Sequence, residues 1–83
     1  MSEQLRNDIR RHRFEQGEMT QQELADAAGC SRQTVVMLEQ ERYSPSLALA
    51  MRIARVFGAR VDELFWMDGM ETATGRGAGD APR

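Results

Sequence analysis

The sequence contains little of what cross-linked or metal-bound scaffolds require. It has one cysteine, Cys30, and one histidine, His12, among 83 residues. A single cysteine cannot form an internal disulfide, and these two residues cannot supply the four ligands of a typical Cys/His zinc site. The sequence therefore predicts neither a metal site nor a bound cofactor.

Long apolar runs are also missing. No segment approaches the roughly 20 apolar residues that a membrane-spanning helix needs. The first residues, MSEQLRNDIRRHR, are too polar for a secretory signal peptide. We therefore expect a cytoplasmic protein that does not interact with membranes. A chain of this length forms one small domain, and its apolar residues, 41% of the total, are enough for one core.

Constellations of catalytic residues are absent too. The sequence has no paired carboxylates suited to acid–base chemistry, no nucleophile beside a base and no glycine loop that could cradle phosphates. The chain is therefore not expected to be an enzyme.

The net charge of −2, taken over the whole chain, argues against nucleic-acid binding, but the distribution of charge matters more than the total. Residues 1–60 hold nine arginines against eight acidic residues, so the acidic excess lies in the remaining C-terminal part.

Helical periodicity and capping signals predict an all-α fold of five short helices. The first helix covers about residues 4–16, with Leu5, Ile9 and His12 at helical spacing. The last is a short helix over residues 61–65. The sequence shows no strand-like alternation of apolar and polar residues.

A very short turn separates the second and third predicted helices. Helix 2, about residues 21–28, follows a Thr-x-x-Glu capping box that begins at Thr20. Gly29 ends this helix, and Ser31 caps the next one, about residues 32–40. Two helices joined by so short a glycine turn must cross at a steep angle, which is the geometry of a helix-turn-helix.

The fourth predicted helix carries the clearest apolar stripe. Ser46 caps it, and the residues expected in the core are Leu47, Ala50, Ile53, Ala54 and Phe57. We expect the folded domain to cover residues 1–67. Residues 68–83 are rich in Gly, Ala and Thr and are expected to form a disordered tail.

The run from Ile9 to Phe65 resembles the Cro and phage-repressor (Xre-type) helix-turn-helix family of bacterial DNA-binding regulators. The resemblance is carried by MTQQELADAAGCSRQTVVMLEQERYSPSLALAMRIARVFG and the VDELF that follows shortly after. It is greatest to the small single-domain members. It implies a five-helix, lambda repressor-like domain in which helices 2 and 3 form the helix-turn-helix. It also implies sequence-specific binding to double-stranded DNA in order to regulate transcription.

The resemblance assigns base contacts to the third helix, the recognition helix, whose N-terminal part enters the major groove. Arg32 and Gln33 would contact base edges, since arginine pairs with guanine and glutamine with adenine. Val36 and Met37 lie one turn further along. Either they contact thymine methyl groups, or one of them packs into the domain.

Contacts to the DNA backbone are implied for a second set of residues: Gln21, Thr34, Arg42 and Tyr43. Such contacts position a protein on the duplex without reading its sequence. Relatives commonly carry Asn-Gly where this chain has Gln40 and Glu41. A left-handed turn is costlier without glycine, and the carboxylate of Glu41 would repel a nearby phosphate.

Two further groups of residues have expected roles. Arg13 and Glu39 occupy positions that form an ion pair in the family, linking the first helix to the end of the third. Phe65, Trp66 and Met67 adjoin one another at the end of the domain. They either close the core or form the interface of a homodimer, which would bind a near-palindromic operator with half-sites about 34 Å apart.

Some alternatives stay open at this stage. His12 is either a packed core residue or a pH sensor. Cys30 lies beside a helix N-terminus, which lowers the pKa of a thiol, and is either an ordinary turn residue or a redox sensor. The predicted function is a transcriptional repressor. The alternative is a protein-interaction module, such as an antitoxin whose partner is a toxin.

Overall fold

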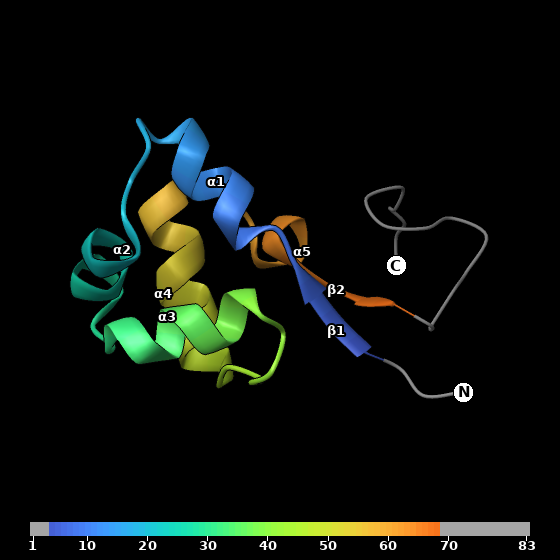
Figure 1. Ribbon diagram of the computed structural model, residues 1–83. Coiled ribbons are helices and arrows are strands. Elements are labelled where there is room, and N and C mark those ends of the chain that lie inside the picture. Colours follow the sequence, from blue (N-terminus) through green and yellow to red (C-terminus); the bar gives the residue numbers. More distant parts are fainter. Residues whose placement is uncertain (1–3, 69–83) are drawn as a thin grey trace.

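The computed structural model describes residues 4–68, which form five helices and two short strands (Figure 1). In chain order the elements are β1 (Gln4–Asn7), α1 (Ile9–Glu15), α2 (Gln21–Ala28), α3 (Arg32–Glu39), α4 (Leu47–Phe57), α5 (Val61–Leu64) and β2 (Phe65–Asp68). The five predicted helices are present, and α2 and α3 form the helix-turn-helix pair.

The starts of α2, α3 and α4 follow from side-chain caps. Thr20 Oγ1 accepts a hydrogen bond from Glu23 N at 3.0 Å, and Glu23 Oε1 accepts one from Thr20 N at 2.8 Å. Ser31 caps α3 and Ser46 caps α4 in the same way, each accepting from a backbone N–H three residues on at 3.1 Å. These bonds satisfy amide groups that the first turn of a helix would otherwise leave unpaired.

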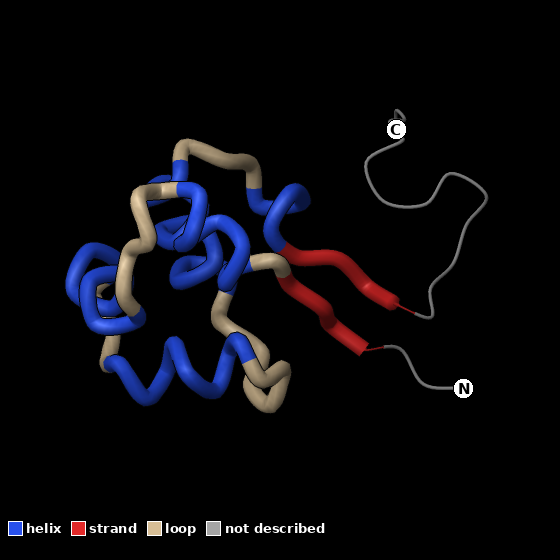
Figure 2. The backbone as a smooth tube through the Cα atoms, turned by 45° about the horizontal axis from the view of Figure 1, so that its top comes forward, coloured by secondary structure: helices blue, strands red, loops and turns tan. Residues whose placement is uncertain are grey.

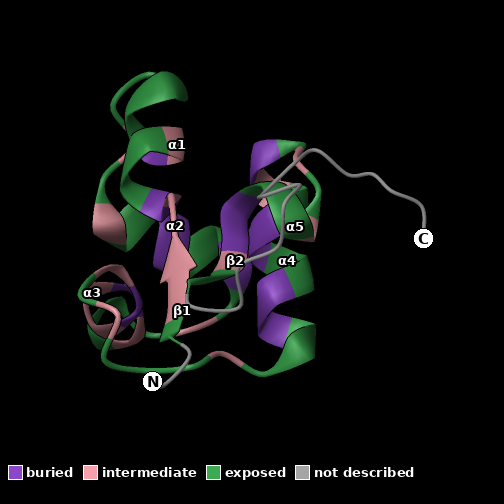
Figure 3. Ribbon diagram, turned by 90° about the vertical axis from the view of Figure 1, so that its right-hand side faces the viewer, coloured by how far each residue is buried: buried purple, intermediate pink, exposed green. Residues whose placement is uncertain are grey.

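The core lies where the inward faces of the helices meet. Its largest fully buried side chains come from five different helices: Ile9, Leu24, Val35, Leu38, Ile53 and Leu64. Figure 3 shows buried parts of α4, α5 and β2 near one another, and α4 carries several of them along its length. Each helix therefore contributes one apolar face to a single core, as expected for a small helical domain.

The prediction that the chain contains no strands was wrong. β1 and β2 pair antiparallel, with Leu5 opposite Met67 and Arg6 opposite Trp66, and they run side by side in Figure 2. The first helix consequently begins at Ile9 rather than near residue 4. Strands of four residues are too short to show a pattern, and their backbone groups pair only after the two ends of the domain have met.

One predicted core residue is at the surface. Leu47 is 71% exposed, whereas Leu49, which the stripe omitted, is 5% exposed. At roughly 100° per residue, a helical face centred between Ile53 and Phe57 includes Leu49 and leaves Leu47 at its edge. The four other members of the predicted stripe are buried.

The described residues include no helix long and apolar enough to cross a membrane. The predicted disordered tail, apart from its first residue, lies outside the described residues. That first residue, Asp68, belongs to β2, where it pairs with Gln4. The boundary predicted at residue 67 therefore falls within a strand.

Candidate nucleic-acid interface

The turn between α2 and α3 sets the angle between the two helices. Gly29 adopts the left-handed conformation with φ of +74°, which glycine tolerates because it lacks a Cβ. Cys30 N then donates to Ala25 O at 3.0 Å, closing the end of α2. The chain turns sharply here, and Figure 1 shows α3 leaving in a new direction, with its outer side toward solvent.

Arg32 and Gln33, the predicted base-contacting residues, lie in the first turn of α3 and are exposed. Val35 and Leu38 occupy the opposite side of the same helix and are fully buried. This division anchors α3 by its inner face. It leaves the long polar side chains of its first turn free to approach a ligand.

Val36 and Met37 are half-buried, between these two extremes. Neither belongs to the buried core, so the domain covers each side chain only in part. Their remaining surface adjoins Arg32 and Gln33 one turn along the helix. The solvent-facing side of α3 therefore combines polar and apolar groups.

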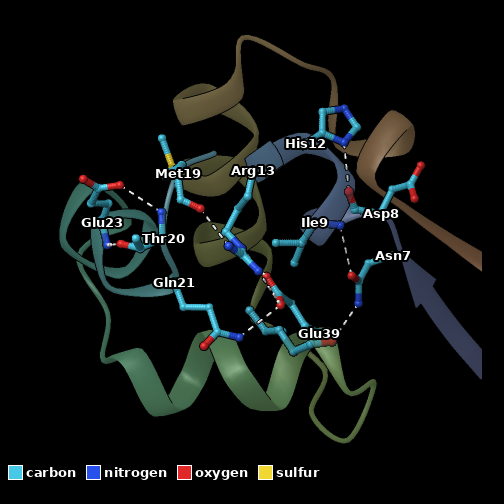
Figure 4. Close-up of polar contacts among 11 residues, drawn as sticks. Asn7, Asp8, Ile9, His12, Arg13, Met19, Thr20, Gln21, Glu23 and Glu39 are labelled. Atoms are coloured by element: carbon cyan, nitrogen blue, oxygen red, sulfur yellow. Dashed lines mark hydrogen bonds and ion pairs between the residues drawn. The ribbon is translucent and has the colours of Figure 1, made fainter. Parts of the chain in front are cut away.

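A buried ion pair joins α1 to the end of α3 (Figure 4). Arg13 Nε donates to Glu39 Oε2 at 2.6 Å and Arg13 Nη2 to Glu39 Oε1 at 3.1 Å, and both side chains are 9% exposed. Arg13 Nη1 also donates to Met19 O at 2.7 Å. Paired in a bidentate geometry, the two charges fix the distance between α1 and α3.

Gln21, a predicted phosphate-contacting residue, takes part in the same network. Its Nε2 donates to Glu39 Oε1 at 3.1 Å, so its side chain points toward α3 (Figure 4). Gln21 thus ties the first turn of α2 to the recognition helix. In this arrangement its side-chain amide supports α3, and its backbone N–H lies at the N-terminus of α2.

The other predicted phosphate-contacting residues have different environments. Thr34 is half-buried, and its Oγ1 lies 2.9 Å from Ser31 Oγ. Arg42 and Tyr43 are exposed in the segment after α3. Glu41, just before them, has a φ of +62°, so the chain takes the left-handed turn here without glycine.

Contacts from β1 at this end of α3 were not predicted. Asn7 Nδ2 donates to Leu38 O at 2.7 Å, while Asn7 Oδ1 accepts from Ile9 N at 3.1 Å. Arg6 Nε donates to the carboxylate of Glu41 at 2.9 Å, and this contact raises the pKa of Arg6. The sequence did contain a signal for the start of α1 at this point. Asparagine often accepts a hydrogen bond from the backbone N–H two residues on, and so favours the start of a helix.

The three apolar residues at the end of the domain differ in burial. Phe65 is 7% exposed and belongs to the core, while Met67 is 39% exposed. Trp66 is half-buried. Phe65 thus closes the core, while Trp66 and Met67 each keep part of their surface exposed.

His12 is a packed residue at the edge of the core. It is half-buried, its ring lies 5.4 Å from that of Phe57, and its Nδ1 lies 3.0 Å from Asp8 O.

Residues 4–68 hold no group of three or more His, Cys, Asp or Glu side chains placed to bind a metal ion.

Burial raises the pKa of the Cys30 thiol above its ordinary value of 9.0, and the nearby charge of Arg52 only partly opposes this. The expectation of a lowered pKa was therefore wrong. The thiol lies partly among apolar neighbours, where the charged thiolate is disfavoured. A thiol that resists ionisation is a poor redox sensor.

Cys30 should accordingly react slowly with iodoacetamide at pH 8, because the thiolate is the reactive form. In the native protein the rate should rise with pH later than in the protein unfolded in urea. The same shift affects stability. The raised pKa stabilises the folded state fully at pH values below the pKa of the unfolded chain, and this stabilisation is lost as the pH rises through the higher pKa of the folded state. If the alkylation rate depended on pH in the same way in the folded and the unfolded protein, the pKa of Cys30 would not be raised by folding.

Comparison with known proteins agrees with this geometry. The family model described as Helix-turn-helix matches residues 11–64. A protein of Archaeoglobus fulgidus is 51% identical over 67 residues, which is 81% of this chain and 94% of the relative. One of Methanothermobacter thermautotrophicus is 51% identical over 65 residues, 77% of this chain and 93% of the relative.

A protein of Bacillus subtilis is 33% identical over 64 residues, 77% of this chain and 96% of the relative. All three relatives are named as uncharacterized HTH-type transcriptional regulators, and two of the three are archaeal. The matched region includes α2, the turn at Gly29 and α3, together with both partners of the buried ion pair. The chain belongs to the Xre-type (Cro and phage-repressor) helix-turn-helix family, a non-enzymatic class of DNA-binding regulators.

Proposed function

We propose that this regulator represses transcription by binding a near-palindromic operator as a homodimer, with α3 in the major groove. The observation that carries the proposal is the exposed first turn of α3, set on a helix whose opposite side is fully buried. A helix fixed in this way can present side chains to base edges with constant geometry. The proposal places the protein in the cytoplasm, with the DNA it binds.

Arg32 and Gln33 read bases in this proposal. Arginine donates two parallel hydrogen bonds to O6 and N7 of guanine, and glutamine pairs with N6 and N7 of adenine. Val36 and Met37, whose surfaces are partly open, make apolar contacts with thymine methyl groups. Each good bidentate pair discriminates against a wrong base by about 1–3 kcal/mol.

The DNA backbone is held by residues at both ends of the helix pair. Arg42 and Tyr43 are exposed just beyond α3, and Thr34 lies in its first turns. Gln21 contributes through its backbone N–H at the N-terminus of α2, where a helix favours an anion. These contacts fix the position of the protein on the duplex and carry no sequence information.

The homodimer forms through the C-terminal strand in this proposal. Met67 exposes 39% of its surface, and Trp66 is half-buried beside it on β2. Methionine and tryptophan are favoured in protein interfaces. A two-fold dimer of this fold places its recognition helices about 34 Å apart, one helical turn of DNA.

A protein-interaction module, such as an antitoxin that binds a toxin, is the second candidate. Leu47 and Met51 support it, because these apolar side chains of α4 are 71% and 55% exposed and lie outside the proposed DNA-binding residues. The salt dependence of binding separates the two candidates. Phosphate contacts make log affinity fall linearly with log salt, whereas an apolar protein interface shows little slope.

Selection of bound duplexes from a random library tests the proposal. The wild type should enrich a near-palindrome, and Arg32→Ala and Gln33→Ala should each relax the preference at one base position per half-site. Arg55→Ala is the matched control, since it removes one exposed arginine of α4 that is not among the proposed DNA-contacting residues. It should leave the selected sequence unchanged. An Arg32→Ala variant as selective as the wild type would refute the assignment of α3.

A further inference from the structure

An acidic side chain lies at the end of the proposed DNA-binding surface. Glu41 directly follows Gln40, the C-cap of α3, and precedes Arg42 and Tyr43, which we assign to the DNA backbone. A free carboxylate at this point would repel the phosphates that those two residues approach. Glu41 also takes the left-handed conformation, φ +62°, which is uncommon for a residue with a Cβ.

The structure turns this carboxylate away from solvent and onto β1. Arg6 Nε donates to it at 2.9 Å, and Asn7 N donates to Glu41 Oε2 at 3.4 Å. The side chain of Glu41 is 20% exposed, against 41% for that of Arg6. The negative charge is thus paired and partly covered by a strand that lies far from it in the sequence.

Arg6 is itself held in place from two sides. Its Nη1 donates to Asp68 Oδ2 at 3.0 Å on β2, the strand that pairs with β1. The neighbouring Asn7 anchors β1 to the end of α3 through its 2.7 Å bond to Leu38 O (Figure 4). The guanidinium of Arg6 is therefore presented to Glu41 by backbone and side-chain bonds that do not involve DNA.

We propose that Arg6 is a positioning residue for DNA binding: it holds the Glu41 carboxylate on β1, neutralises its charge and so keeps the turn after α3 open to phosphates. This inference rests on the proposed function. Once paired, the two opposite charges act on a phosphate as a dipole, whose field falls off faster than that of a single charge. The two-stranded sheet, outside the helix-turn-helix, thereby serves the DNA-binding surface.

A double-mutant cycle tests this. Arg6→Gln frees the carboxylate and should weaken binding to the selected duplex about ten-fold, a loss of roughly 1.4 kcal/mol. Glu41→Gln removes the repelling charge and should stay within about three-fold of wild type. The double variant should bind like Glu41→Gln alone, because Arg6 then has no charge to hold. Such non-additivity marks an interaction between the two residues.

Arg11→Gln is the matched control. Like Arg6, Arg11 is a partly exposed arginine paired with two carboxylates, those of Asp8 and Glu15, and its loss changes the net charge equally. It lies on α1, outside the helix-turn-helix pair and the turn after α3, and should change affinity by less than about two-fold. Thermal unfolding of each variant, measured alongside, shows that the folded state is present at the assay temperature.

Salt supplies a second readout. The difference in affinity between wild type and Arg6→Gln should shrink as ionic strength rises, because the screening length falls from about 10 Å at 0.1 M to about 3 Å at 1 M. If Arg6→Gln also weakened DNA binding in a protein that already carries Glu41→Gln, Arg6 would contact DNA itself. That result would overturn the inference. An effect no larger than that of Arg11→Gln would overturn it too. A wild type that binds no duplex at low salt would refute the proposed function as well.

Discussion

Replacing Glu39 with leucine should lower the free energy of unfolding by about 3–5 kcal/mol. The substitution leaves the guanidinium of Arg13 buried, since that residue is 7% exposed and would retain only its bond to Met19 O. Gln21 Nε2 loses its acceptor at the same time. Because small domains are stable by only about 5–15 kcal/mol, urea denaturation should show a much lower midpoint or no cooperative transition.

Two comparisons separate this effect from a general intolerance of substitution. Glu15→Leu removes one partner of an exposed pair, whose side chains are 57% and 59% exposed, and should cost less than about 1 kcal/mol. The double variant Arg13→Met, Glu39→Leu removes both charges and should recover much of the lost stability, because an apolar pair needs no desolvation of ions. A Glu39→Leu protein as stable as Glu15→Leu would show that the pair does not support the fold.

Truncation of Ile53 to alanine should destabilise the protein by about 2–5 kcal/mol. Ile53 is fully buried in the middle of α4, where the side chains of several helices meet, so the missing atoms leave a cavity. The measurement is again urea denaturation, with the slope against urea compared to confirm that both proteins unfold as one unit.

Leu47→Ala on the same helix is the matched control. The sequence pattern placed Leu47 in the apolar stripe of α4, but the side chain is 71% exposed. Its truncation should change stability by no more than about 0.5 kcal/mol. A loss comparable to that of Ile53→Ala would mean that Leu47 packs against the domain in solution.

The starts of α2, α3 and α4 and the turn of the helix-turn-helix could be predicted from the sequence because they depend on near neighbours. A cap bonds a backbone N–H two or three residues on, so Thr20, Ser31 and Ser46 mark the starts of α2, α3 and α4 within a few letters. The left-handed turn at Gly29 is similarly local. Family membership follows from this ordered set of signals.

The surroundings of the candidate site could be predicted only in part. The family pattern pointed to Arg13 and Glu39, but no pattern pointed to Arg6, and the sequence alone suggested that the Glu41 carboxylate would repel a nearby phosphate. Which carboxylate meets which guanidinium depends on the fold, because Arg6 and Glu41 lie 35 residues apart. Cys30 is a similar case, since its helix terminus suggested a lowered pKa and its burial raises it.

The sequence by itself therefore determined that five helices form, the caps of α2, α3 and α4 and the exposed first turn of α3, because helical periodicity and capping act over three or four residues. The tertiary structure alone decided the β1–β2 pairing, the surface position of Leu47 and the partner of Glu41. These features depend on segments brought together only when the core forms. A strand of four residues has no partner, and the Glu41 carboxylate no guanidinium, until β1 and β2 meet at the end of α3.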